Sequence, residues 1–135
     1  MTHKFEHRSL GLEGNMPLVY TAMSKHLFFM REHISRHVLE NDGVPLNPFM
    51  IFNYFLGDTV NRDVIRKANN SLVTVAEQLW MYGPVSDGAL AEIIQAKKQG
   101  MVIRYFGLVD SKDFVELSVE NVVFEENIKD QRAII

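Results

Sequence analysis

The residues with the clearest chemical potential are a short polar loop and a glutamate that follows it. Ser86, Asp87 and Gly88 come soon after Gly83, which ends an apolar run, and they open a helical stretch that contains Glu92. The first turn of a helix offers unpaired backbone N–H groups and the positive end of the helix dipole, so this loop could bind a phosphate. The alternative is that Ser86 or Asp87 simply caps the helix, and an aspartate would repel a phosphate.

Glu92 is a candidate functional carboxylate because small residues surround it on a helical wheel. Gly88, Ala89 and Ala96 share its side, which leaves space above the carboxylate. Its i+3 and i+4 neighbours are Gln95 and Ala96, so it has no following basic residue for an ion pair. From spacing alone, an ordinary solvated glutamate remains the alternative.

Short apolar runs alternate with amphipathic helical segments, and these elements must position the loop and the glutamate. The predicted strands are residues 18–23, 44–47, 78–82 and 101–106. The predicted helices are residues 25–41, 60–76 and 86–98. Helices of this length between strands are what parallel neighbours require. The pattern predicts an α/β fold, a three-layer, doubly wound, mostly parallel sheet of about five strands.

The connections are less regular. Residues 49–55 are an irregular or short helical connection, and Asp58 or Thr59 is the expected cap of the second helix. Residues 113–118 and 122–126 have the composition of further strand or edge segments.

In open α/β sheets, ligands bind at the carboxyl ends of the strands where the strand order reverses. The site is therefore expected in the loops after the first and third strands.

Length and composition exclude several classes of protein. The 135 residues predict a single domain, 1–135, whose first 15 residues are an irregular extension. The net charge of −3 argues against binding nucleic acid. No apolar stretch approaches the roughly 20 residues of a membrane span, and residues 1–15 lack the apolar core of a signal peptide. The absence of cysteine is compatible with a reducing compartment, and we expect a cytoplasmic protein.

Two further groups of residues have side chains that could take part in chemistry. His33 and His37 are four residues apart, with His26 two turns earlier, but no third ligand is evident, so surface histidines are favoured over a metal site. The aromatic residues could form the wall of a base-binding pocket or belong to the core or a subunit interface. They are Phe28, Phe29, Phe49, Phe52, Tyr54 and Phe55.

Residues 71–106 resemble the nucleoside 2-deoxyribosyltransferase-like family, which includes the deoxynucleoside 5'-monophosphate N-glycosidases. Ser86, Glu92, Ala96 and Gly100 stand at matching places, and the resemblance extends more loosely over residues 19–76. It implies a flavodoxin-like fold, no cofactor, and a homodimer or higher homo-oligomer that acts on a small-molecule nucleoside or nucleotide. The implied reaction is N-glycosidic bond cleavage or transfer.

The resemblance also implies roles for individual residues. Glu92 would be the nucleophile that attacks the anomeric carbon, as in retaining glycoside cleavage, and the helix dipole is expected to keep it ionised. Ser86 would contact a 5'-phosphate, with Asp87, Gly88 and Gly83 in the same substrate-binding loop.

Two positions depart from the family pattern. Asn69 stands where the family has an aspartate, and an amide cannot transfer a proton near neutral pH. Ser24 and Lys25 replace a glycine-rich, arginine-containing loop after the first strand, and Lys25 is either a phosphate ligand or a solvated lysine. The alternatives to an enzyme are a non-catalytic nucleotide-binding module of the same fold and a structural oligomer.

Overall fold

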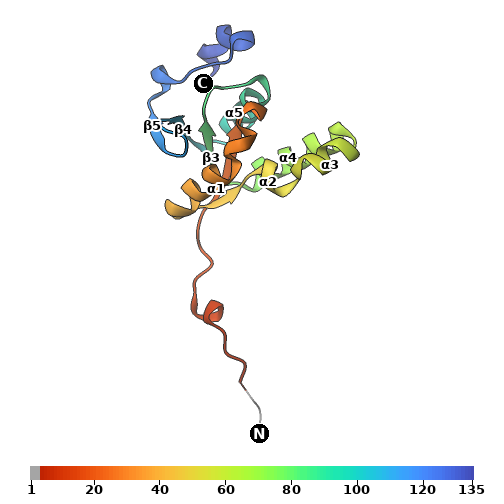
Figure 1. Cartoon of the computed structure of the whole chain (residues 1–135), viewed down its shortest axis with the longest axis vertical. Coiled ribbons are helices and arrows are strands. Elements are labelled where there is room, and N and C mark those ends of the chain that lie inside the picture. The colour runs from red at the N-terminus through yellow and green to blue at the C-terminus, as the bar shows by residue number, and fades with distance from the viewer. Residues whose placement is uncertain (1–3) are drawn as a thin grey trace.

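A five-stranded sheet forms the centre of the molecule (Figure 1). The computed structural model describes residues 4–135, apart from the side chains of residues 54 and 55. The strands are β1 (Leu18–Met23), β2 (Val44–Leu46), β3 (Gln78–Tyr82), β4 (Val102–Leu108) and β5 (Phe114–Leu117). Their order is β2-β1-β3-β4-β5, and the first four run parallel while β5 is antiparallel to β4. The predicted α/β fold with a mostly parallel sheet of about five strands is confirmed.

Helices cover both faces of this sheet. The α-helices are α1 (Arg31–Glu40), α2 (Pro48–Ile51), α3 (Asn53–Thr59), α4 (Arg62–Val75) and α5 (Asp87–Lys98). Four 3-10 helices accompany them: η1 (Arg8–Gly11), η2 (Lys25–Met30), η3 (Val119–Asn121) and η4 (Glu126–Ile134). Figure 1 shows α3 and the start of α4 projecting away from the sheet. No helix in residues 4–135 is long and apolar enough to cross a membrane.

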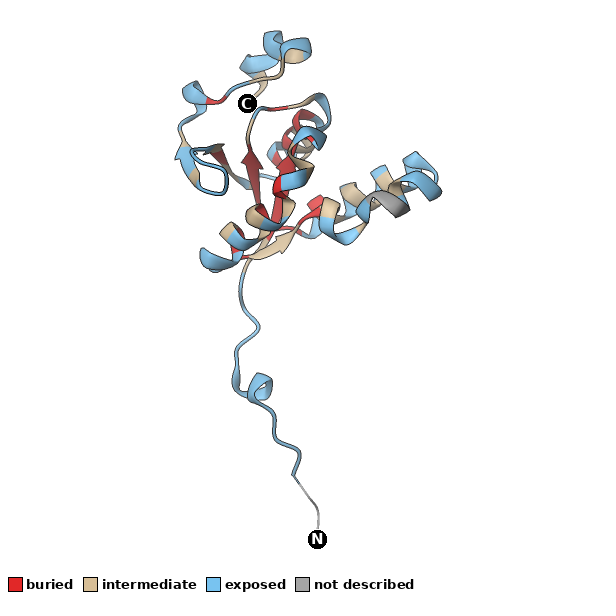
Figure 2. Cartoon of the chain, viewed as in Figure 1, coloured by how far each residue is buried: buried red, intermediate tan, exposed pale blue. Residues whose placement is uncertain are grey.

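The period-2 alternation of the strands divides the core into two clusters. Tyr20 and Leu79 face α5 and the end of α4, whereas Val19 and Trp80 face α1. Figure 2 shows buried residues concentrated in the central strands and on the inner sides of the helices. Because β1 and β3 are central and parallel, both faces of each are buried, and this explains why their sequences are almost continuously apolar.

The early end of β2 leaves part of β1 open. Residues 44–46 pair only with residues 18–20, so residues 21–23 have no strand neighbour on that side. Pro48 cannot donate a backbone hydrogen bond and instead begins α2. The buried Asn47 caps this helix by accepting from the Phe49 N–H at 3.1 Å, and its Nδ2 donates to the Arg31 carbonyl and to Ser35 Oγ, each at 3.1 Å. The chain is thereby directed away from the sheet edge.

Several predicted boundaries need correction. The segment predicted as one helix, 25–41, begins as the 3-10 helix η2 before α1, and its first turn is capped by Ser24. The cap of α4 is Asn61, not Asp58 or Thr59, because residues up to Thr59 belong to α3. Residues 122–126 do not form a strand. They follow η3 and contribute one isolated bridge, Val85 with Phe124.

Candidate functional site

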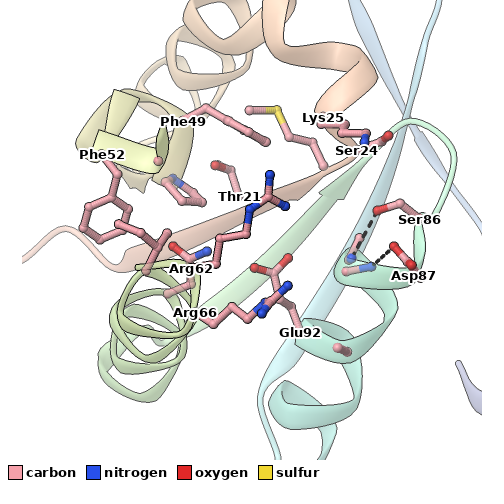
Figure 3. Close-up of a pocket in the computed structure, with 18 of the residues that line it drawn as sticks. Thr21, Ser24, Lys25, Phe49, Phe52, Arg62, Arg66, Ser86, Asp87 and Glu92 are labelled. Carbon is pink, nitrogen blue, oxygen red and sulfur yellow. Dashed lines mark hydrogen bonds between the residues drawn. The ribbon is translucent and has the colours of Figure 1, made fainter. Parts of the chain in front are cut away.

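A cavity of about 650 Å³ lies at the carboxyl ends of β1 and β3, beside the open part of β1 (Figure 3). Thr21, Ser24 and Lys25 line it from β1 and the following loop. Phe49 of α2 and Phe52, the residue that follows this helix, line it from one side. The helix α4 contributes Arg62, Arg66 and Asn69. The loop before α5 and its first turns contribute Ser86, Asp87, Gly88 and Glu92. Loops at the ends of adjacent parallel strands meet at this edge because β1 and β3 are neighbours.

The cavity brings together seven of the eight residues that the sequence indicated as site residues. Glu92, Ser24, Lys25, Asn69, Ser86, Asp87 and Gly88 all line it. Gly83 does not. It has φ of +72°, its N–H donates to the Phe106 carbonyl at 2.8 Å, and a Cβ there would lie 2.5 Å from Leu27 Cδ1. The backbone conformation and the packing of the turn after β3 therefore account for the glycine at position 83.

The Glu92 carboxylate contacts a buried tyrosine. The Tyr20 hydroxyl donates a hydrogen bond to Glu92 Oε2, and Tyr20 itself is fully buried. Tyr20 lies on the face of β1 that packs against α5, so the strand and the helix position the pair together. Burial, and the neighbouring Glu92 carboxylate, raise the pKa of Tyr20 well above its ordinary value, so the phenol stays protonated and remains a donor.

The ionisation of Glu92 differs from the sequence expectation. Burial raises the pKa of Glu92 to about 7, and the hydrogen bond from Tyr20 opposes this rise. The helix dipole was expected to keep the carboxylate charged. That effect is confined to the first turn, however, and Glu92 is the sixth residue of α5. Near neutral pH, Glu92 is therefore present in both protonation states.

The start of α5 is capped by its own side chains. Ser86 Oγ accepts from the Ala89 N–H at 3.2 Å, and Asp87 Oδ1 accepts from the Gly88 N–H at 2.7 Å. Both groups still line the cavity. The capping role that the sequence offered as an alternative is thus present, and the Asp87 carboxylate places negative charge beside these N–H groups.

Five residues of α4 line the cavity, and three of them have polar side chains on one face of the helix. Arg62, Arg66 and Asn69 follow the i, i+4, i+7 spacing, and Figure 3 shows both arginines reaching toward the space that Glu92 enters from α5. Arg66 also forms an ion pair with Asp63 at 2.8 Å. Asn69 Oδ1 is a buried acceptor that has no hydrogen-bond partner among the described residues. A ligand in the cavity could supply the missing donor.

The aromatic segment contributes to the wall. Phe49 and Phe52 line the cavity, and Phe28 packs edge-on against Phe49 with ring centroids 5.6 Å apart. Phe29 is exposed. The side chains of Tyr54 and Phe55 lie outside the described part of the structure.

The three histidines of the predicted first helix do not share one site. His26 lines the main cavity, whereas His33 and His37 line a second, smaller pocket beside α1. His37 Nδ1 is 2.7 Å from the Tyr82 hydroxyl, and its ring packs against Phe106 and Phe114. Burial and the nearby Arg104 lower the pKa of His37. Within residues 4–135, no three histidine, aspartate or glutamate side chains are grouped so that they could hold a metal ion.

The sequence analysis missed Tyr20, Arg62 and Arg66. The two arginines had a detectable signal, because they share the helical face of Asn69 in the predicted helix 60–76. Tyr20 had none, because an aromatic residue inside an apolar strand is indistinguishable from any core residue until its neighbours are known.

The family model for a domain of unknown function, DUF7768, matches residues 18–106. The match extends over most of the chain and runs from β1 into β4, so the chain belongs to the DUF7768 family. No curated protein and no solved structure matched the chain. The matched range includes every cavity residue discussed above.

The raised pKa of Glu92 predicts that its charge destabilises the folded state. Below pH 4.5 the carboxyl is neutral in both the folded and unfolded states; above about pH 7 it is charged in both, and burial then disfavours the folded one. The free energy of unfolding of the wild type, relative to Glu92→Gln, should therefore fall by about 1 to 3 kcal/mol between pH 4.5 and 8. Urea denaturation at several pH values measures this difference.

The matched control is Glu120→Gln, which changes an exposed glutamate of η3. Its difference from the wild type should stay flat over the same range. A flat difference for Glu92→Gln as well would contradict the burial of this carboxylate.

Proposed function

We propose that the chain cleaves or transfers the N-glycosidic bond of a (deoxy)nucleoside or its 5'-monophosphate in the cytoplasm, with Glu92 as the nucleophile. The observation that carries the proposal is the Glu92 carboxylate, which accepts a hydrogen bond from the buried Tyr20 and lines a cavity of about 650 Å³. This volume is within the range of small-molecule sites. The resemblance of residues 71–106 to the nucleoside 2-deoxyribosyltransferase-like family supports the same assignment.

In the proposed reaction, the ionised Glu92 attacks the anomeric carbon of the sugar. A C–O bond to the carboxylate forms as the C–N bond to the base breaks, and the base leaves with the bonding electrons and takes a proton from solvent. Water or a second base then attacks the same carbon and releases Glu92 as a carboxylate. The hydrogen bond from Tyr20 to Oε2 positions the carboxylate and leaves Oε1 for the attack.

The rest of the cavity supplies binding groups for such a ligand. Phe49 and Phe52 provide aromatic surface for a base, and the unpartnered Asn69 Oδ1 can accept from a sugar hydroxyl or a base amine. Because Asn69 is an amide, it binds and orients but transfers no proton. Ser86, Gly88, Ser24 and Lys25 lie on the cavity wall and complete the proposed substrate site.

Base release is the first test. The purified chain is incubated with deoxynucleosides and their 5'-monophosphates, and free base is followed by chromatography. Release by the wild type should fall by roughly 10³-fold or more in Glu92→Gln, because the amide cannot form the ester intermediate. The exposed control Glu120→Gln should retain full activity.

Release that survives Glu92→Gln would contradict the proposed mechanism. Thermal stabilisation by a nucleotide without any base release would instead favour a non-catalytic binding module of the same fold.

Tyr20→Phe tests the role of the tyrosine. The hydrogen bond from Tyr20 lowers the pKa of Glu92, so its loss should raise that pKa above about 7. Activity that requires ionised Glu92 should rise with pH through about 7 in the wild type and through a higher pH in Tyr20→Phe. The measurement is kcat/KM against pH. An unchanged acidic limb would show that Tyr20 does not act on Glu92.

We also propose that the chain forms a homodimer or higher homo-oligomer through the segment from α2 to α4. Met50, Ile51, Leu56 and Val64 expose apolar surface there, next to the cavity wall. Sedimentation velocity should show an assembled species for the wild type and a shift toward monomer for Val64→Glu, since burying a charge in an interface is unfavourable. A monomeric wild type at micromolar concentration would contradict this proposal.

A further inference from the structure

We infer that Arg62, on α4, is the residue that binds the anionic group of the ligand, and that the cavity therefore prefers a nucleoside 5'-monophosphate to the corresponding nucleoside. This inference rests on the proposed function and names its substrate class. It places the phosphate against α4, across the cavity from the Ser86 loop to which the family resemblance pointed.

The basic side chains in the cavity wall differ in whether they form ion pairs. Arg66 forms an ion pair with Asp63, which neutralises part of its charge. Lys25 and Arg62 also line the cavity, and neither side chain forms an ion pair or a hydrogen bond with any residue in the described part of the chain. Lys25 ends in an ammonium group, which is a point charge, whereas Arg62 ends in a guanidinium group. Figure 3 shows this guanidinium group in the space between Thr21 and Glu92. An unpaired arginine directed into a cavity is suited to a phosphate, because its planar fork matches two phosphate oxygens.

The alternative phosphate site, at the start of α5, has backbone N–H groups that already have acceptors. The Gly88 and Ala89 N–H groups at the start of α5 already donate to Asp87 Oδ1 and Ser86 Oγ. A phosphate at this position would have to displace the Asp87 carboxylate or remain beside it, and two negative charges at that distance repel each other. The start of α5 is therefore a weaker phosphate site than its loop sequence indicated.

The spacing of Arg62 and Asn69 along α4 suits a ligand of the size of a nucleotide. Arg62 and Asn69 lie on the same face of α4, and the rise of 1.5 Å per residue separates their Cα atoms by about 10 Å along the helix axis. This separation is comparable with the length of a nucleotide. A single ligand can therefore place its phosphate at Arg62 and its sugar or base beside Asn69, with Glu92 reaching the sugar from α5. A nucleoside without the phosphate would leave Arg62 without a partner.

The experiment measures binding without turnover. Titration calorimetry is performed in the Glu92→Gln background with a deoxynucleoside and with its 5'-monophosphate, at fixed salt. With Arg62 present, the monophosphate should bind at least about tenfold tighter than the nucleoside. Arg62→Gln should weaken monophosphate binding by about tenfold and change nucleoside binding by less than about twofold.

Arg8→Gln is the matched control, and Ser86→Ala tests the alternative position of the phosphate. Arg8→Gln removes the same charge from η1, which is not part of the cavity wall, and should change neither affinity. Ser86→Ala should leave the preference for the monophosphate intact. Circular dichroism and thermal melting of each variant establish that it is folded.

Several results would overturn the inference. They are equal affinity for the two ligands, a preference that survives Arg62→Gln, a preference that disappears in Ser86→Ala alone, and binding of neither ligand. Base release by the wild type is measured separately. Release without any dependence on Arg62 would contradict this inference and leave the proposed function in place. Arg62-dependent binding without release would contradict the proposed function and leave Arg62 as the residue that binds the anionic group.

Discussion

The hydrogen bond from the buried Tyr20 to the partly buried Glu92 is the constraint on which the site depends. A carboxylate taken out of water is costly unless a hydrogen-bond donor compensates it, and the tyrosine hydroxyl is that donor. The contact joins α5 to β1, a strand that lies more than 70 residues earlier in the chain. It also keeps the pKa of Glu92 near neutrality, where a carboxyl group can act in either protonation state.

The cavity in front of this carboxylate exists because one strand stops early. The Asn47-Pro48 step ends β2 after three residues and starts α2, so the last residues of β1 have no neighbour at the sheet edge. Asn47 stabilises this change of direction with hydrogen bonds to α1 and α2. The helices α2 and α4 then form a separate wall, and this wall presents aromatic and basic side chains to the acidic group on α5.

The cavity wall carries charges of both signs. Arg62 and Arg66 belong to α4 and Asp58 to the preceding helix α3, while Asp87 and Glu92 belong to α5. Membership of the DUF7768 family assigns no activity. The proposed nucleoside chemistry therefore rests on this arrangement of side chains and on the local resemblance around Glu92. An anionic, aromatic ligand with a sugar between its two ends fits the order of the groups.

Local sequence patterns determined the elements and most of the site. Short apolar runs rich in strand-forming residues predicted residues 18–23 and 78–82 as strands with their observed bounds. The Ser86 cap marked the start of α5, and Gly100 marked the turn after its end. These signals are local, because they depend on side-chain periodicity and on backbone preferences within a few residues. Tertiary structure alone decided the partner of Glu92, the rise of its pKa and the packing that explains Gly83. Those properties depend on which distant residues exclude water from a group, and no pattern within one segment contains that information.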